Sequence, residues 1–77
     1  MNGKLISFCV DRPSSSNYTP RSLMLQYAKE HPGMVSVRPG LTTALTIFGV
    51  RCVYDHWSIT RSAPDIETVT VYLSREM

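Results

Sequence analysis

The strongest periodic pattern in the chain is an apolar stripe over residues 20–31, which predicts an amphipathic helix. Thr19 can accept a hydrogen bond from a free amide of the first turn, and Pro20 suits that turn because its position needs no amide hydrogen. Pro32 and Gly33 then end the pattern. The side chains expected to face the core are those of Leu23, Met24, Tyr27, Ala28 and His31.

Most of the other apolar residues favour extended structure, because they alternate with polar residues or are rich in β-branched and aromatic types. Residues 41–48 fit both a helical stripe and a strand, and we favour the strand. Polar stretches at residues 11–17 and 61–65 are predicted to be a loop and a turn. Strands are predicted over residues 4–10, 34–38, 50–57 and 67–74.

This order of elements predicts a small single α+β domain, in which the helix packs on a mostly antiparallel sheet of four to five strands. With 77 residues the chain has room for one core. A domain of this size usually gains only about 3–5 kcal/mol from its core. A homodimer is therefore a second expectation, and an exposed sheet edge would allow either self-pairing or strand addition to a partner.

The N-terminal apolar run reaches only from Leu5 to Val10, which is too short for the core of a signal peptide. No stretch approaches the roughly 20 apolar residues that span a bilayer. We therefore expect a soluble cytoplasmic protein without a membrane partner. In that compartment Cys9 and Cys52, which both lie in apolar runs, are expected to be reduced and buried.

The residue types that carry chemistry do not fall into a catalytic or metal-binding pattern. Cys9, His31, Cys52 and His56 are zinc-ligand types, but they lack the close pairs of zinc modules, and a strand would separate Cys52 from His56 by about 13 Å. Asp55 and His56 would point to opposite faces of that strand. No serine lies in a Gly-x-Ser-x-Gly turn. We therefore expect a protein that is not an enzyme and uses neither metal nor cofactor.

Nucleic acid is the runner-up partner. The formal net charge is only +2 and the arginines are scattered singly, so the chain lacks the cation density of proteins that bind phosphates by counterion release. Residues 65–75 nevertheless resemble the recognition helix of helix-turn-helix proteins, with Asp65 as the cap and Thr70 and Arg75 facing the groove. That resemblance implies a DNA-binding transcriptional regulator. The β-branched run in this segment favours a strand instead, and we prefer the strand.

The remaining feature is a cluster of aromatic and cationic residues in the predicted strand over residues 50–57 and just after it. Tryptophan, tyrosine and arginine carry much of the binding energy at protein interfaces. An alternative is that Trp57 fills the core, in which case Tyr54 or His56 should be exposed on the other face. The predicted partner-binding residues are Arg51, Tyr54, His56, Trp57 and Arg61.

Taken together, these features predict a small non-catalytic regulator or inhibitor that binds another protein stoichiometrically. The prediction is partly one of elimination, since the chain offers little besides its surface to act with. Small proteins of this kind are often made by phages or mobile elements to block a host enzyme, and we expect such an origin.

Overall fold

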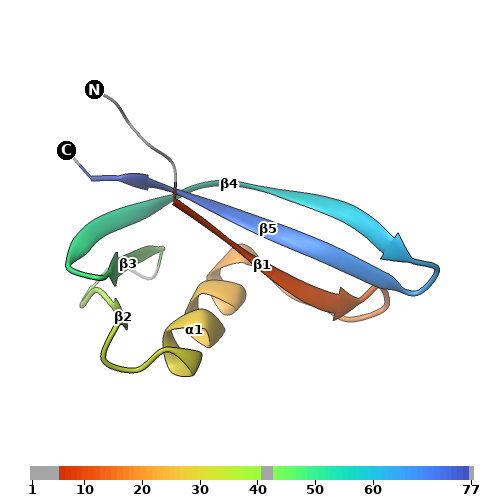
Figure 1. The fold of residues 1–77 in the computed structure, drawn as a ribbon, viewed down its shortest axis with the longest axis horizontal. Coiled ribbons are helices and arrows are strands. Elements are labelled where there is room, and N and C mark those ends of the chain that lie inside the picture. The colour runs from red at the N-terminus through yellow and green to blue at the C-terminus, as the bar shows by residue number, and fades with distance from the viewer. Residues whose placement is uncertain (1–5, 41–42, 77) are drawn as a thin grey trace.

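The computed structural model describes residues 6–40 and 43–76, which form a five-stranded antiparallel sheet with one helix on its concave face (Figure 1). The sheet curls like half of a barrel, in the order β1-β5-β4-β3-β2. The fold is mostly β and agrees with the expected class in its coarse form. Its elements are β1 (Ile6–Pro13), α1 (Pro20–Glu30), β2 (Val35–Val37), β3 (Ala44–Ile47), β4 (Val50–Ala63) and β5 (Ile66–Arg75).

The helix begins at Pro20 with Thr19 as its N-cap, as the sequence predicts, and the structure shows in addition that the cap is reciprocal. The Thr19 hydroxyl accepts from the Ser22 amide at 3.1 Å, and the Ser22 hydroxyl accepts from the Thr19 amide at 3.0 Å. This capping box satisfies donors that the first turn leaves unpaired. The helix ends at Glu30, one residue before the predicted end, and His31 is its C-cap.

Two predicted strands continue into stretches that were expected to be irregular. β1 extends to Pro13, and β4 extends to Ala63, so the turn that joins β4 to β5 is confined to the two residues 64–65. Both extensions have the same cause, because β5 continues the ladder with Arg12 opposite Glu67 on one side and Ala63 opposite Ile66 on the other. From the sequence alone, polar residues at the ends of strands are assigned to loops, because the strands they pair with are not known. Residues 4–5 of the first predicted strand lie outside the described residues.

The structure decides both ambiguous segments in favour of strands. Residues 44–47 form β3, as preferred, while residues 41–42 lie outside the described part. The predicted strand over residues 34–38 is present but shorter, as β2. Residues 66–75 form β5, which pairs with β1 and β4 on its two sides, so the recognition-helix interpretation is wrong.

The core lies between α1 and the concave face of the sheet. Leu23 and Met24 of α1 are almost fully buried there, as predicted. Tyr27 stacks on Phe8 of β1 with ring centroids 4.1 Å apart, which anchors the helix to the N-terminal strand. The sheet contributes the buried side chains of Val35, Leu45, Ile47, Cys52, Val69, Val71 and Leu73.

A two-residue turn, Phe48-Gly49, joins β3 to β4, since Ile47 pairs directly with Val50. Both turn residues have positive φ, 50° at Phe48 and 82° at Gly49, as expected for a turn that matches the twist of a hairpin. A left-handed backbone costs a residue with a side chain about 1–2 kcal/mol. Phe48 is nevertheless 71% exposed, so burial of its ring does not offset that cost.

Across the described residues, the structure has no helix with the length and apolar character needed to cross a membrane.

Candidate functional site

The predicted partner-binding residues on β4 do not share one face of the sheet. Tyr54 lies opposite Leu73 and Trp57 lies opposite Val71, both on the concave face. His56 lies opposite Tyr72 on the convex face. A shift in the register between Tyr54 and His56 produces this arrangement, because a β-bulge inserts one extra residue and changes which side chains share a face. Strict alternation along β4 would have placed Tyr54 and His56 together.

Trp57 takes the alternative role that the sequence allowed, since it packs against the core cluster. Its indole meets the Tyr18 ring edge-on at 5.6 Å. Tyr18 in turn donates a hydrogen bond from its hydroxyl to Glu67 at 2.8 Å, and this bond raises the pKa of Tyr18. His56 is exposed as expected for that case, with 54% of its side chain accessible, and stacks on Tyr72.

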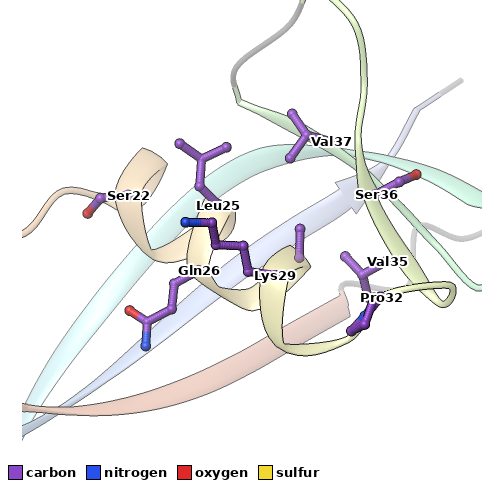
Figure 2. A pocket seen from close by; sticks show the side chains of 9 residues that line it. Ser22, Leu25, Gln26, Lys29, Pro32, Val35, Ser36 and Val37 are labelled. Atoms are coloured by element: carbon purple, nitrogen blue, oxygen red, sulfur yellow. The ribbon is translucent and has the colours of Figure 1, made fainter.

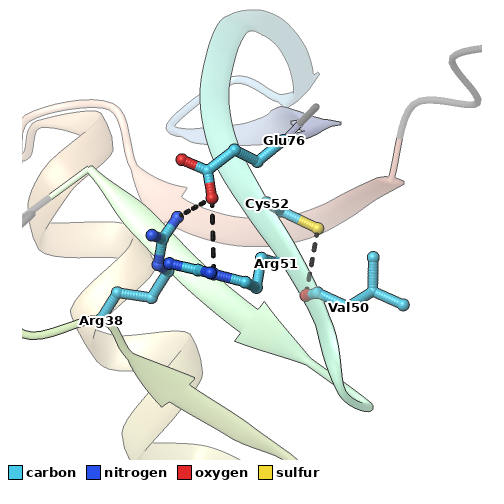
Figure 3. Close-up of polar contacts among 5 residues, drawn as sticks. All are labelled: Arg38, Val50, Arg51, Cys52 and Glu76. Atoms are coloured by element: carbon cyan, nitrogen blue, oxygen red, sulfur yellow. Dashed lines mark hydrogen bonds and ion pairs between the residues drawn. The ribbon is translucent and has the colours of Figure 1, made fainter.

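The two arginines of the predicted cluster lie apart from the aromatic residues. Arg51 is 65% exposed in its side chain, and its Nε lies 3.4 Å from Glu76, which also forms a 2.6 Å ion pair with Arg38 (Figure 3). Arg61 is exposed near the far end of β4, where it donates to the Pro64 carbonyl at 3.4 Å. A single flat partner surface therefore cannot contact all five predicted residues at once.

Both cysteines are free, but only Cys52 is buried. Cys9 is exposed, contrary to expectation, because it lies opposite Thr70 on the convex face, which no helix covers (Figure 1). Burial raises the pKa of the Cys52 thiol. Among the described residues, no group of three or more His, Cys, Asp or Glu side chains is placed to hold a metal ion.

This difference predicts two well-separated thiol reactivities. Ellman's reagent at pH 8 should titrate Cys9 at once, whereas Cys52 should react only as fast as the domain opens, because the thiolate is the nucleophile and Cys52 is both shielded and harder to deprotonate. Cys9→Ser should remove the fast phase alone. Equal rates for both thiols in the folded protein would contradict the placement of Cys52.

The surface has a groove of about 680 Å³ between α1 and β2 (Figure 2). Its helical wall is formed by Ser22, Leu25, Gln26 and Lys29, which are spaced i, i+3, i+4 and i+7. They lie on the face of α1 beside the one that enters the core. Leu25 and Val37 face each other across it and are 38% and 36% exposed. The residues that line the groove are Ser22, Leu25, Gln26, Ala28, Lys29, Pro32, Val35, Ser36 and Val37.

β2 contributes an open edge to this groove. In the β2–β3 ladder the Arg38 amide donates to Ala44 and the Phe48 amide donates to Met34, so the even-numbered residues of β2 bond to β3. The backbone groups of Val35 and Val37 therefore point away from the sheet. The Val35 amide donates a hydrogen bond to the His31 carbonyl at 2.9 Å. The Val35 carbonyl and both backbone groups of Val37 are left on the groove side.

The surface of the groove is mostly apolar. Lys29 is the one ionisable residue that lines it in the described part of the chain. Sequence reasoning missed this site because its walls come from the outer face of a predicted helix and from a strand too short to show a pattern. The available signal was Leu25, an apolar residue off the core stripe.

Comparisons of the chain with protein-family models, with curated proteins and with solved structures found no match.

Proposed function

We propose that this protein is a small non-catalytic regulator or inhibitor that binds an extended segment of another protein in the groove between α1 and β2. The observation that carries the proposal is that an apolar groove adjoins an open strand edge. An extended segment placed there can bond to the Val35 carbonyl and to Val37 while its alternate side chains contact the groove. Strand addition combines affinity from main-chain bonds with specificity from side-chain pockets.

The chemistry of the groove defines the segment it would take. Alternate apolar side chains would cover Leu25 and Val37, whose exposed apolar surface is otherwise in unfavourable contact with water. Lys29 on the rim favours an acidic residue nearby. The proposed ligand is therefore a short extended segment with alternating apolar residues and an acidic flank.

A displayed library of random linear peptides, selected on the immobilised protein, tests this function. Enriched peptides should show apolar residues at every second position. Val37→Pro removes the amide donor of the open edge and keeps a small apolar side chain in the groove. Proline is tolerated on edge strands, so the fold should persist while peptide affinity falls at least about tenfold. Leu25→Asp should weaken the same peptides by placing a charge among apolar contacts.

The matched controls are Val37→Thr, which keeps the amide, and Arg61→Ala, which lies on the distant end of β4. Both should retain the selected peptides. If the selected peptides bind the groove variants as tightly as the wild type but no longer bind Arg51→Ala, His56→Ala or Arg61→Ala, the binding surface lies on β4 and the proposed groove site is wrong. Enrichment of no peptide would also overturn it.

The alternative of a DNA-binding transcriptional regulator no longer has a recognition helix to support it, because residues 66–75 form β5, an interior strand of the sheet. The groove, with one cation on its rim, offers no row of contacts for phosphates.

A further inference from the structure

β1 forms the edge of the sheet opposite to β2 (Figure 1). It pairs with β5 in one unbroken register over all eight of its residues, from Ile6 opposite Leu73 to Pro13 opposite Ile66. Natural edge strands are usually blunted by bulges, by lysines or by their short length. β1 has no bulge against β5 and no lysine, and its charged residues and its proline are confined to its last three positions, 11–13. It is therefore the sheet edge best able to accept another strand.

The hydrogen-bond pattern shows which residues of β1 offer free backbone groups. The Ser14 amide donates to the Asp65 carbonyl at 2.9 Å, which continues the register of β1 and β5. On the other side of β5, the Glu76 amide donates to Arg51 of β4. Since bonded and non-bonded pairs alternate in an antiparallel ladder, even-numbered residues of β1 bond to β5. The amides and carbonyls of Ser7, Cys9 and Asp11 point outward.

We propose that the occupant of this edge is a second copy of the same chain, paired antiparallel through β1 about a twofold axis at Cys9. In this register Cys9 faces Cys9 of the second copy, and Ser7 faces Asp11 on both sides of the axis. All three outward residues are used, which gives about six backbone hydrogen bonds. A register shifted by one pair toward the C-terminus would place Ser7 opposite Pro13, which has no amide hydrogen.

The side chains of β1 suit this self-pairing. On the convex face, each Asp11 carboxylate meets a Ser7 hydroxyl, which can donate to it. The two Asp11 residues then lie about 13 Å apart along the strand direction, so they do not repel at close range. On the concave face, Phe8 meets Val10 of the second copy, and both belong to or pack against the core. The pairing therefore continues the apolar layer as well as the sheet.

The dimer is independent of peptide binding, because β1 and β2 are the two opposite edges of the sheet. Two grooves would remain open in each dimer. A segment captured by β2 and a second copy paired through β1 can be present together. Failure of one proposal therefore leaves the other standing.

Sedimentation over a concentration series, with reductant present, tests the association. The wild-type chain should convert from monomer to dimer as concentration rises. Cys9→Pro removes one outward amide from each copy at the twofold axis, and the dimer dissociation constant should rise at least about tenfold. Cys9→Ser keeps the amide and should dimerise like the wild type. Circular dichroism of Cys9→Pro shows whether the monomer still folds.

Cross-linking with a short thiol reagent tests the register without relying on the proline variant. Wild-type protein should form a Cys9 to Cys9 cross-link between copies. In a Cys9→Ser background, Ser7→Cys together with Asp11→Cys should join position 7 to position 11 between copies, whereas Ser7→Cys alone should give almost no dimer. A monomer at every concentration, or efficient linkage of position 7 to position 7, would overturn the proposal.

Discussion

Leu73→Ala is expected to leave most of the protein unfolded at 25 °C. Leu73 is fully buried on the concave face, where it lies opposite Ile6 of β1 and Tyr54 of β4. Removing a buried leucine costs about 2–5 kcal/mol, through lost transfer free energy and the cavity left behind. A domain of this size has about 3–5 kcal/mol to lose.

Urea titration followed by circular dichroism measures this effect. The Leu73→Ala transition should begin at or below zero denaturant, whereas Ser58→Ala, an exposed position on the convex face, should change the free energy of unfolding by no more than about 0.5 kcal/mol. All variants must be compared at one protein concentration, because association would add to the apparent stability. A fully folded Leu73→Ala protein with wild-type stability would contradict the described core.

Trp57→Ala is expected to lower the free energy of unfolding by an amount near the lower end of the about 3–5 kcal/mol that truncation of a core tryptophan costs. The indole is only half-buried, but it is the edge-on partner of Tyr18, which also bonds to Glu67. Its loss therefore loosens the loop between β1 and α1 as well as the face of β4.

His56→Ala provides the contrast, since His56 is the exposed neighbour on the other face of the same strand. It should change unfolding by no more than about 0.5 kcal/mol. Thermal unfolding of the two variants side by side decides the matter. If His56→Ala is the more damaging change, the two residues have been assigned to the wrong faces.

The elements of this fold could largely be predicted because their patterns are local. The helical stripe around Leu23 and Met24 and the capping residues Thr19 and Ser22 are all contained within residues 19–31, so period and chemistry agree. The strand ends could not be predicted in the same way. Arg12 and Ser62 belong to strands only because β5 runs between them, and that fact is not visible in their neighbours.

The candidate site was harder to predict than the fold, for two physical reasons. A single inserted residue at Asp55 changes which face each side chain of β4 takes, and bulges have no reliable sequence signal when no glycine is present. The groove depends on how far α1 lies from the edge of β2, which is a property of packing. Composition drew attention to the aromatic and cationic residues of β4, whereas the groove is lined by aliphatic and small polar residues of α1 and β2.

The position of β5 has a consequence for how the chain folds. β5 is the most C-terminal strand described, yet it lies in the interior of the sheet, between β1 and β4. Its pairing with β1 closes a loop from Ile6 to Leu73, so folding cannot be completed by neighbouring segments alone. High contact order of this kind slows folding into the millisecond to second range. During synthesis, β1 cannot pair with β5 until almost the whole of this sequence has left the ribosome.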